Sequence, residues 1–142
     1  MKRIASIQDV SCLGRCSQTV ALPVVSTMGV ECAILPTAVL STHTSFPDFR
    51  CLDLTDQLLP VARHWKAQGV RFDALYTGYL ASDRQVAVVL ELLELLREEG
   101  TLLFVDPAMA DHGKLYAGFG ADHRAQHHRG QPDDRPALPG GL

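Results

Sequence analysis

The stretch Leu35-Pro-Thr-Ala-Val-Leu-Ser-Thr-His-Thr44 decides the fold of this chain, because it leads from a short β-branched run into a loop rich in hydroxyl groups. Thr77-Gly-Tyr-Leu80 and Val105-Asp-Pro-Ala-Met-Ala-Asp111 repeat this arrangement with hydroxyl- or carboxylate-bearing loops. An open α/β sheet binds its ligand in the crevice beyond the carboxyl ends of its strands. The three stretches therefore predict an α/β fold with a ligand site where these loops meet.

The composition is that of an ordinary globular protein. A chain of 142 residues is long enough for one domain with a core and too short for two. The net charge of −3 is too small to suggest a nucleic-acid or membrane partner. Cys12, Cys16, Cys32 and Cys51 show no spacing typical of zinc ligands, and no segment reaches the roughly 20 apolar residues of a membrane span. We expect a cytoplasmic protein with reduced thiols.

The apolar pattern predicts strands that alternate with helices. The expected strands are 4–7, 32–35 (ended by Pro36), 74–77 and 102–105, and a long loop is expected over 37–50. One helix should begin at Ser17 and end at Gly29, and another should run over about 56–68 with Pro60 in its first turn. A third should begin with a capping box of Ser82 and Gln85 and carry an apolar stripe through Val86, Val89, Leu90, Leu93 and Leu96. This alternation is typical of a parallel sheet with right-handed crossovers.

Residues 121–142 differ from the rest of the chain. They contain no aromatic and no β-branched residue, so they cannot bury enough apolar surface to offset the entropy of ordering. We expect a disordered tail here. His123, His127 and His128 offer an alternative interpretation as metal ligands, which the biased composition does not favour.

The loops carry side chains suited to a small polar ring compound. Thr42, His43 and Thr44 can match a phenolic oxygen or a ring nitrogen, and Tyr79 can cover a ligand face. Asp106 and Asp111 would suit a divalent cation with phosphate oxygens. The alternatives are threonine hydroxyls bound to local backbone, a buried histidine, a core tyrosine and a simple Asp-Pro turn.

Together with Ile7-Gln-Asp-Val-Ser-Cys-Leu-Gly14, these stretches resemble the pyridoxal/pyridoxamine kinases of the ribokinase-like superfamily over about residues 3–119. The resemblance implies the N-terminal part of an open, mainly parallel sheet with flanking helices in residues 1–120, followed by a disordered or out-of-frame tail. It also implies ATP-dependent phosphorylation of the 5′-hydroxyl of pyridoxal, pyridoxamine or pyridoxine with Mg²⁺, and a homodimer. Related kinases phosphorylate hydroxymethylpyrimidine, so that thiamine precursor is an alternative substrate.

The resemblance also assigns site residues. It implies that Asp9 or Ser11, His43, Thr44 and Tyr79 contact the vitamer, and that Asp106 and Asp111 contact Mg²⁺ and ATP. Many family members have serine where this chain has Asp9. A carboxylate at that position could pair with a protonated ring nitrogen.

Two motifs of the superfamily are missing from the sequence. A Gly-x-Gly-Asp stretch normally supplies the catalytic base and an anion hole, and an Asn-x-x-Glu stretch helps to organise Mg²⁺, but neither occurs here. We therefore assign no catalytic residue and expect a truncated or frameshifted kinase whose 142 residues are inactive alone. The alternatives are a half-domain that binds B6 vitamers without catalysis, or a fragment that does not fold stably because its last strand has an exposed edge.

Overall fold

The computed structural model describes residues 1–106, 108, 110–111 and 114–115. Its elements, in chain order, are β1 (Arg3–Ser11), α1 (Gln18–Thr27), β2 (Glu31–Leu40), β3 (Cys51–Asp53), α2 (Thr55–Ala67), β4 (Ala74–Thr77), α3 (Asp83–Leu96), β5 (Leu102–Val105), β6 (Ala110–Asp111) and β7 (Lys114–Leu115). The predicted tail over 121–142, with its histidines, and the predicted boundary at residue 120 lie outside the described residues.

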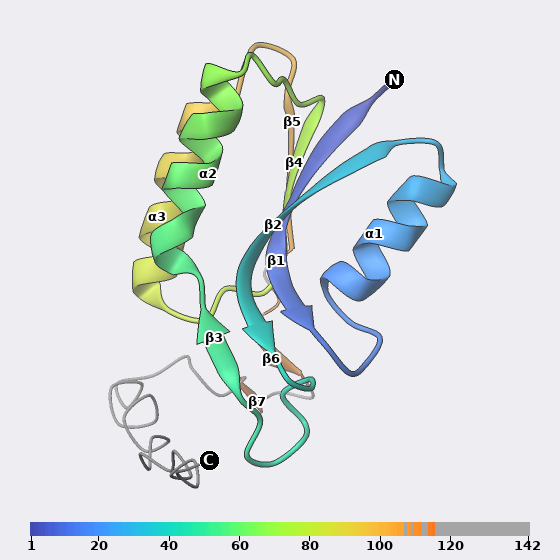
Figure 1. Ribbon diagram of the computed structural model, residues 1–142, viewed down its shortest axis with the longest axis vertical. Coiled ribbons are helices and arrows are strands. Elements are labelled where there is room, and N and C mark those ends of the chain that lie inside the picture. The colour runs from blue at the N-terminus through green and yellow to red at the C-terminus, as the bar shows by residue number, and fades with distance from the viewer. Residues whose placement is uncertain (107, 109, 112–113, 116–142) are drawn as a thin grey trace, which may run out of the picture.

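The main sheet has five strands in the order β3-β2-β1-β4-β5. Strands β2, β1, β4 and β5 run parallel, and β3 lies antiparallel to β2 at one edge. Helix α1 covers one face of this sheet, whereas α2 and α3 lie side by side on the opposite face (Figure 1). The predicted open, mainly parallel α/β sheet with flanking helices is therefore confirmed.

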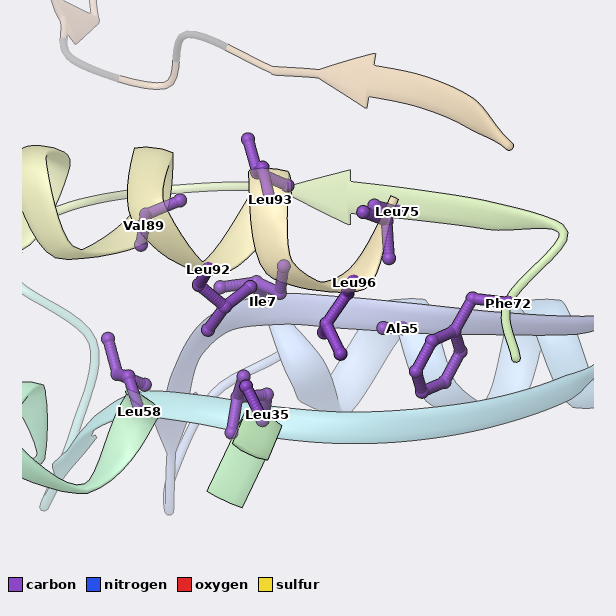
Figure 2. Packing of buried hydrophobic residues seen from close by; sticks show 11 residues of the cluster. Ala5, Ile7, Leu35, Leu58, Phe72, Leu75, Val89, Leu92, Leu93 and Leu96 are labelled. Atoms are coloured by element: carbon purple, nitrogen blue, oxygen red, sulfur yellow. The ribbon is translucent and has the colours of Figure 1, made fainter. Parts of the chain in front are cut away.

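The apolar core fills the space between the sheet and the helix pair α2–α3 (Figure 2). The strands contribute Ala5, Ile7, Leu35 and Leu75, and Phe72 precedes β4. The helices contribute Leu58, Ala62, Val89, Leu92, Leu93 and Leu96. Burying one large aliphatic side chain stabilises a fold by about 1.5–3 kcal/mol, so this layer is the main source of cohesion.

The sheet face beneath α1 is polar instead. Ser6 and Gln8 alternate with the core residues of β1 and are almost completely buried. Gln8 Nε2 donates to Ser6 Oγ over 2.7 Å, and Gln18 Nε2 of α1 donates to the Ser6 carbonyl over 2.6 Å. Helix α1 therefore rests partly on hydrogen-bonded side chains, which cost free energy to bury unless they are paired.

Two predicted strands are longer in the structure. Strand β1 continues through Gln8 and Asp9 to Ser11: Gln8 and Ser11 are buried and pair with β2, and the buried Asp9 lies at the bulge between them. Strand β2 continues through Pro36 to Leu40, so the predicted loop begins four residues too early. Pro36 is tolerated because β3 pairs with β2 only from Ala38 onward and a bulge follows directly.

The predicted capping box at α3 forms in part. Ser82 Oγ accepts from Gln85 N over 3.2 Å, as expected. Gln85 does not return a bond to Ser82, because its buried side chain accepts from Ala81 N (2.8 Å) and donates to the Thr37 carbonyl (3.1 Å) and Thr55 Oγ1 (3.0 Å). Gln85 thus ties α3 to β2 and to the start of α2.

Two further helix details differ from the prediction. Leu90 was expected in the apolar stripe of α3 but is 59% exposed, and Leu92 lies in the core in its place. Pro60 lies inside α2 rather than in its first turn. Since Pro60 and Asp56 are both exposed, water can satisfy the carbonyl that loses its helical partner. Within the described residues, no helix has the length and apolar character needed to span a bilayer.

Candidate functional site

A cavity of about 740 Å³ lies at the carboxyl ends of β1, β4 and β5, beneath α1. Its wall includes Asp9, Ser11, His43, Thr44, Tyr79 and Asp106. These are six of the residues that the sequence predicted as site residues. The end of β1 supplies Asp9 and Ser11, and the segments after β2, β4 and β5 supply the other four. The predicted meeting of these loops at the carboxyl edge of the sheet is therefore observed, although no ligand contact is tested by it.

The remaining predicted residues are not placed in the cavity. Asp111 belongs to β6, but its side chain lies outside the described part of the structure, so the predicted pair with Asp106 is not seen. Thr42 lies beside the cavity residues in sequence but does not line the cavity. Its hydroxyl is buried without a hydrogen-bond partner among the described residues.

Asp9 lies near the C-terminal end of β1 and is only 4% exposed. Ser17 Oγ donates to Asp9 Oδ1 over 2.6 Å, and Ser11 Oγ donates to Asp9 Oδ2 over 3.2 Å. The two hydroxyl donors reach the carboxylate from different elements, because Ser11 ends β1 and Ser17 precedes α1. Asp9 is therefore held in a fixed orientation at the cavity wall.

His43 is fixed by its own loop and by the loop before α1. Its Nδ1 accepts a hydrogen bond from Ser45 N over 3.3 Å, so a neutral ring carries its proton on Nε2. Its ring lies edge-on to Phe46, with the ring centroids 4.8 Å apart. A Cβ at Gly14 would come within 2.8 Å of the His43 ring, so the glycine allows this close approach. His43 can therefore offer an N–H donor to a ligand.

Gly78, directly after β4, forms another close contact in the wall. A Cβ at this position would lie 2.5 Å from Gln8 Oε1. Burial and then the charge of Asp106 raise the pKa of Tyr76, and the polar side chain of Gln8 opposes this rise. Tyr76 is therefore a neutral hydroxyl over the physiological pH range.

Helix α1 supplies the apolar part of the cavity wall, through Val20, Ala21, Val24 and Val25. An aromatic ring with polar substituents would fit between this wall and the polar ends of the strands. Sequence reasoning did not single out Gln8, Arg15, Cys16, Ser17 or Tyr76 as cavity residues, although they line the cavity as well. The signal was weak, because Tyr76 and Ser17 lie in a predicted strand and at the start of a predicted helix. Gln8, Arg15 and Cys16 lie in the predicted loop between the first strand and that helix, but no sequence pattern marks them as ligand-binding residues.

The metal site is not built by the described residues alone. Among them, no group of three His, Cys, Asp or Glu side chains lies close enough to hold an ion. Asp106 is exposed at the end of β5, where its backbone N–H donates to the Thr77 carbonyl over 3.0 Å. A hard divalent cation is compatible with this carboxylate but would need further oxygen ligands.

Known proteins with a similar fold include kinases of B6 vitamers and pyrimidines. A Bacteroides thetaiotaomicron protein, assigned as a phosphomethylpyrimidine kinase and crystallised with pyridoxal, is 45% identical with a TM-score of 0.80 over 84% of this chain. Pyridoxal kinase from Lactobacillus plantarum is 36% identical with a TM-score of 0.75 over 88% of the chain. The chain is similar to the N-terminal half of a pyridoxal kinase.

Other pyridoxal kinases extend the comparison. A Schizosaccharomyces pombe protein named as a pyridoxal kinase is 27% identical over 119 residues, which are 81% of this chain. Pyridoxal kinase from Leishmania donovani, in complex with ADP and pyridoxamine, is 26% identical with a TM-score of 0.68 over 82% of the chain. The chain spans only 38–45% of the length of these relatives. No family model matches the chain.

Proposed function

We propose that this chain contributes the vitamer-binding part of a kinase that uses ATP to phosphorylate the 5′-hydroxyl of pyridoxal, pyridoxamine or pyridoxine. The observation that carries the proposal is the cavity at the carboxyl edge of the sheet, whose wall combines polar groups from the end of β1 and from three loops with apolar side chains of α1. The likeness to a protein crystallised with pyridoxal and to a pyridoxal kinase supports this interpretation.

The cavity suits the parts of a B6 vitamer. The pyridine ring would pack against Val20 and Val24 of α1, and Tyr79 would lie against a ring face. His43 and Thr44 would bind the phenolic oxygen, since each offers a donor. Asp9, or Ser11 beside it, would face the ring nitrogen.

The nucleotide would bind at the end of β5. Asp106, with Asp111, would hold Mg²⁺ and so the phosphates of ATP, because hard cations prefer carboxylate oxygens. Bound Mg²⁺ would supply charge neutralisation for the transferred phosphoryl group. The ADP complexes of the Leishmania enzyme support nucleotide use. The sequence assigns no catalytic base, so residues 1–142 alone are expected to bind the vitamer without turnover. The homodimer and the cytoplasmic location remain predictions.

One alternative substrate has a specific basis. The Bacteroides relative is assigned as a phosphomethylpyrimidine kinase, so hydroxymethylpyrimidine is the second candidate. Both ligands are flat nitrogen heterocycles with a hydroxymethyl group, and both would use the same cavity. The remaining alternative is a half-domain that binds the vitamer and is not part of any kinase.

Equilibrium dialysis of the 142-residue chain tests the proposal. We expect saturable binding of pyridoxal, with weaker binding of hydroxymethylpyrimidine. Thr44→Val removes a cavity hydroxyl and should weaken pyridoxal binding about tenfold. Thr27→Val removes a hydroxyl that bonds to the Pro23 carbonyl in α1 and does not line the cavity, so it should leave binding unchanged.

The readout must not depend on Trp65. Its ring packs against Phe72, with centroids 5.4 Å apart, in the layer on the opposite face of the sheet from the cavity. Tryptophan fluorescence is therefore a poor reporter of ligand binding. Absence of pyridoxal binding by a folded chain would refute the proposal. Stronger binding of hydroxymethylpyrimidine than of pyridoxal would favour the second candidate.

A further inference from the structure

Asp9 lies in an unusual electrostatic position for a carboxylate. It is 4% exposed, yet no Lys, Arg or His in the described part of the chain forms an ion pair with it. Its neighbours donate only through hydroxyl groups. A buried charge without a counter-ion is costly, and Asp9 lines the cavity. A cationic ligand in the cavity would supply the missing charge.

Ser17 forms the shorter of the two bonds to Asp9, and it does so instead of capping its own helix. It occupies the N-cap position of α1 but makes no side-chain hydrogen bond to the first turn. Serine is favoured at this position because its oxygen normally accepts from an early backbone N–H. Here the hydroxyl donates to Asp9 over 2.6 Å. The side chain is therefore used for the cavity rather than for the helix.

The backbone of Ser17 is strained as well. Its φ of 50° and ψ of −128° lie in a region that residues with a Cβ rarely adopt. Such strain persists only where surrounding contacts hold the residue in place, and it is concentrated at functional sites. The bond to Asp9 is the side-chain contact that the structure gives for Ser17. A glycine would accept these angles without cost but could not make the bond.

We propose that Ser17 is a positioning residue that directs the Asp9 carboxylate toward a protonated ring nitrogen of the ligand. The inference rests on the proposed function, because it takes the vitamer to be the ligand of this cavity. With Ser17 bound to Oδ1 and Ser11 bound to Oδ2, the remaining lone pairs of Asp9 accept the N–H⁺ of the ring. Ser17 itself does not need to touch the ligand.

Two ligands and three variants of the full 142-residue chain test this inference. The ligands are pyridoxine and its analogue with a ring CH in place of the nitrogen, measured by equilibrium dialysis at the same pH. We expect the wild type to bind pyridoxine at least tenfold more tightly than the analogue, because a hydrogen bond to a charged group is lost. Asp9→Asn should bind the two ligands about equally.

Ser17→Gly and Ser17→Ala separate positioning from folding. Ser17→Gly loses the bond but relieves the backbone strain, so its melting temperature should exceed that of Ser17→Ala, while its preference for pyridoxine falls about tenfold. Ser17→Ala keeps the strain and loses the bond, so both its melting temperature and its preference should fall. The contrast between the variants distinguishes an effect on the ligand from general destabilisation.

Three results would contradict the positioning role of Ser17 or a claim on which it depends. If Ser17→Gly keeps the full preference for pyridoxine, Ser17 has no positioning role. If the wild type binds both ligands equally, Asp9 does not receive a ring cation, although vitamer binding itself stands. If the wild type binds neither ligand, the proposed function fails, and this inference fails with it.

Discussion

Gly78 shows how closely the cavity wall is packed at the level of single residues. Gly78→Ala would place a Cβ 2.5 Å from Gln8 Oε1 and so displace the side chain that bonds to Ser6. We expect a loss of about 1–3 kcal/mol in unfolding free energy, measured by urea titration, together with weaker pyridoxal binding. Gly69→Ala is the control. It strains a positive φ at the end of α2 in open space, so it should lower stability without changing binding. Unchanged pyridoxal binding by Gly78→Ala would contradict this account.

The charge of Asp106 should be detectable through Tyr76. Burial raises the pKa of Tyr76 above its ordinary value of 10.0, and Asp106 raises it further. A raised pKa means that the neutral phenol stabilises the folded state fully below pH 10 and that this contribution is lost as the pH rises through the folded pKa. Asp106→Asn should therefore lower the pH at which Tyr76 ionises, as measured by tyrosinate absorbance. Tyr76→Phe identifies the titration that belongs to this residue. An unshifted titration in Asp106→Asn would show that the two groups do not interact.

At the level of elements, α3 depends on its N-terminal cap. Ser82 Oγ accepts from Gln85 N, and Ser82 has the extended backbone typical of an N-cap. Ser82→Ala should lower the unfolding free energy by about 1 kcal/mol, whereas Ser82→Asp should retain stability, because aspartate caps as well as serine. Urea midpoints of the two variants give the comparison. An unchanged unfolding free energy in Ser82→Ala would mean that the cap contributes nothing.

The elements also show what the sequence could predict. The bounds of β4 and β5 agree with the predicted strands, because an apolar run between turn signals marks each of them. The end of β1 was missed, since Gln8 and Asp9 are ordinary loop residues by composition and become strand residues only because a cavity and α1 bury them. Strand β3 was missed because its three residues are exposed and show no periodicity.

The candidate site, like the strands, could be predicted from the sequence only in part. Residues in loops after strands, such as His43 and Tyr79, could be grouped because parallel strands end at the same edge of a sheet. Ser17 was predicted only as the start of a helix. Its bond to Asp9 crosses the segment between β1 and α1, and no sequence pattern predicts such a contact.

At the level of the whole molecule, β5 is an edge strand of the described sheet. In the described structure it pairs only with β4, and Leu102, Leu103, Phe104 and Val105 are 41–71% exposed. An exposed apolar edge strand favours association between chains. Leu102→Lys should reduce concentration-dependent association, as measured by light scattering. The control Leu90→Lys makes the same change at an exposed position on α3, away from any strand edge, and should have less effect. Equal effects of the two variants would show that general surface charge, rather than the edge of β5, controls association.

The two faces of the sheet differ in chemistry, and this difference bears on how such a protein can change over generations. The apolar layer beneath α2 and α3 holds the fold together, whereas the hydrogen-bonded layer beneath α1 leads into the cavity. Substitutions at Gln8, Ser11 or Ser17 alter the cavity without removing a side chain from the apolar layer. Mutations at the α1 face can therefore change which ligand binds, whereas the apolar face beneath α2 and α3 mainly determines how much destabilisation the fold can tolerate.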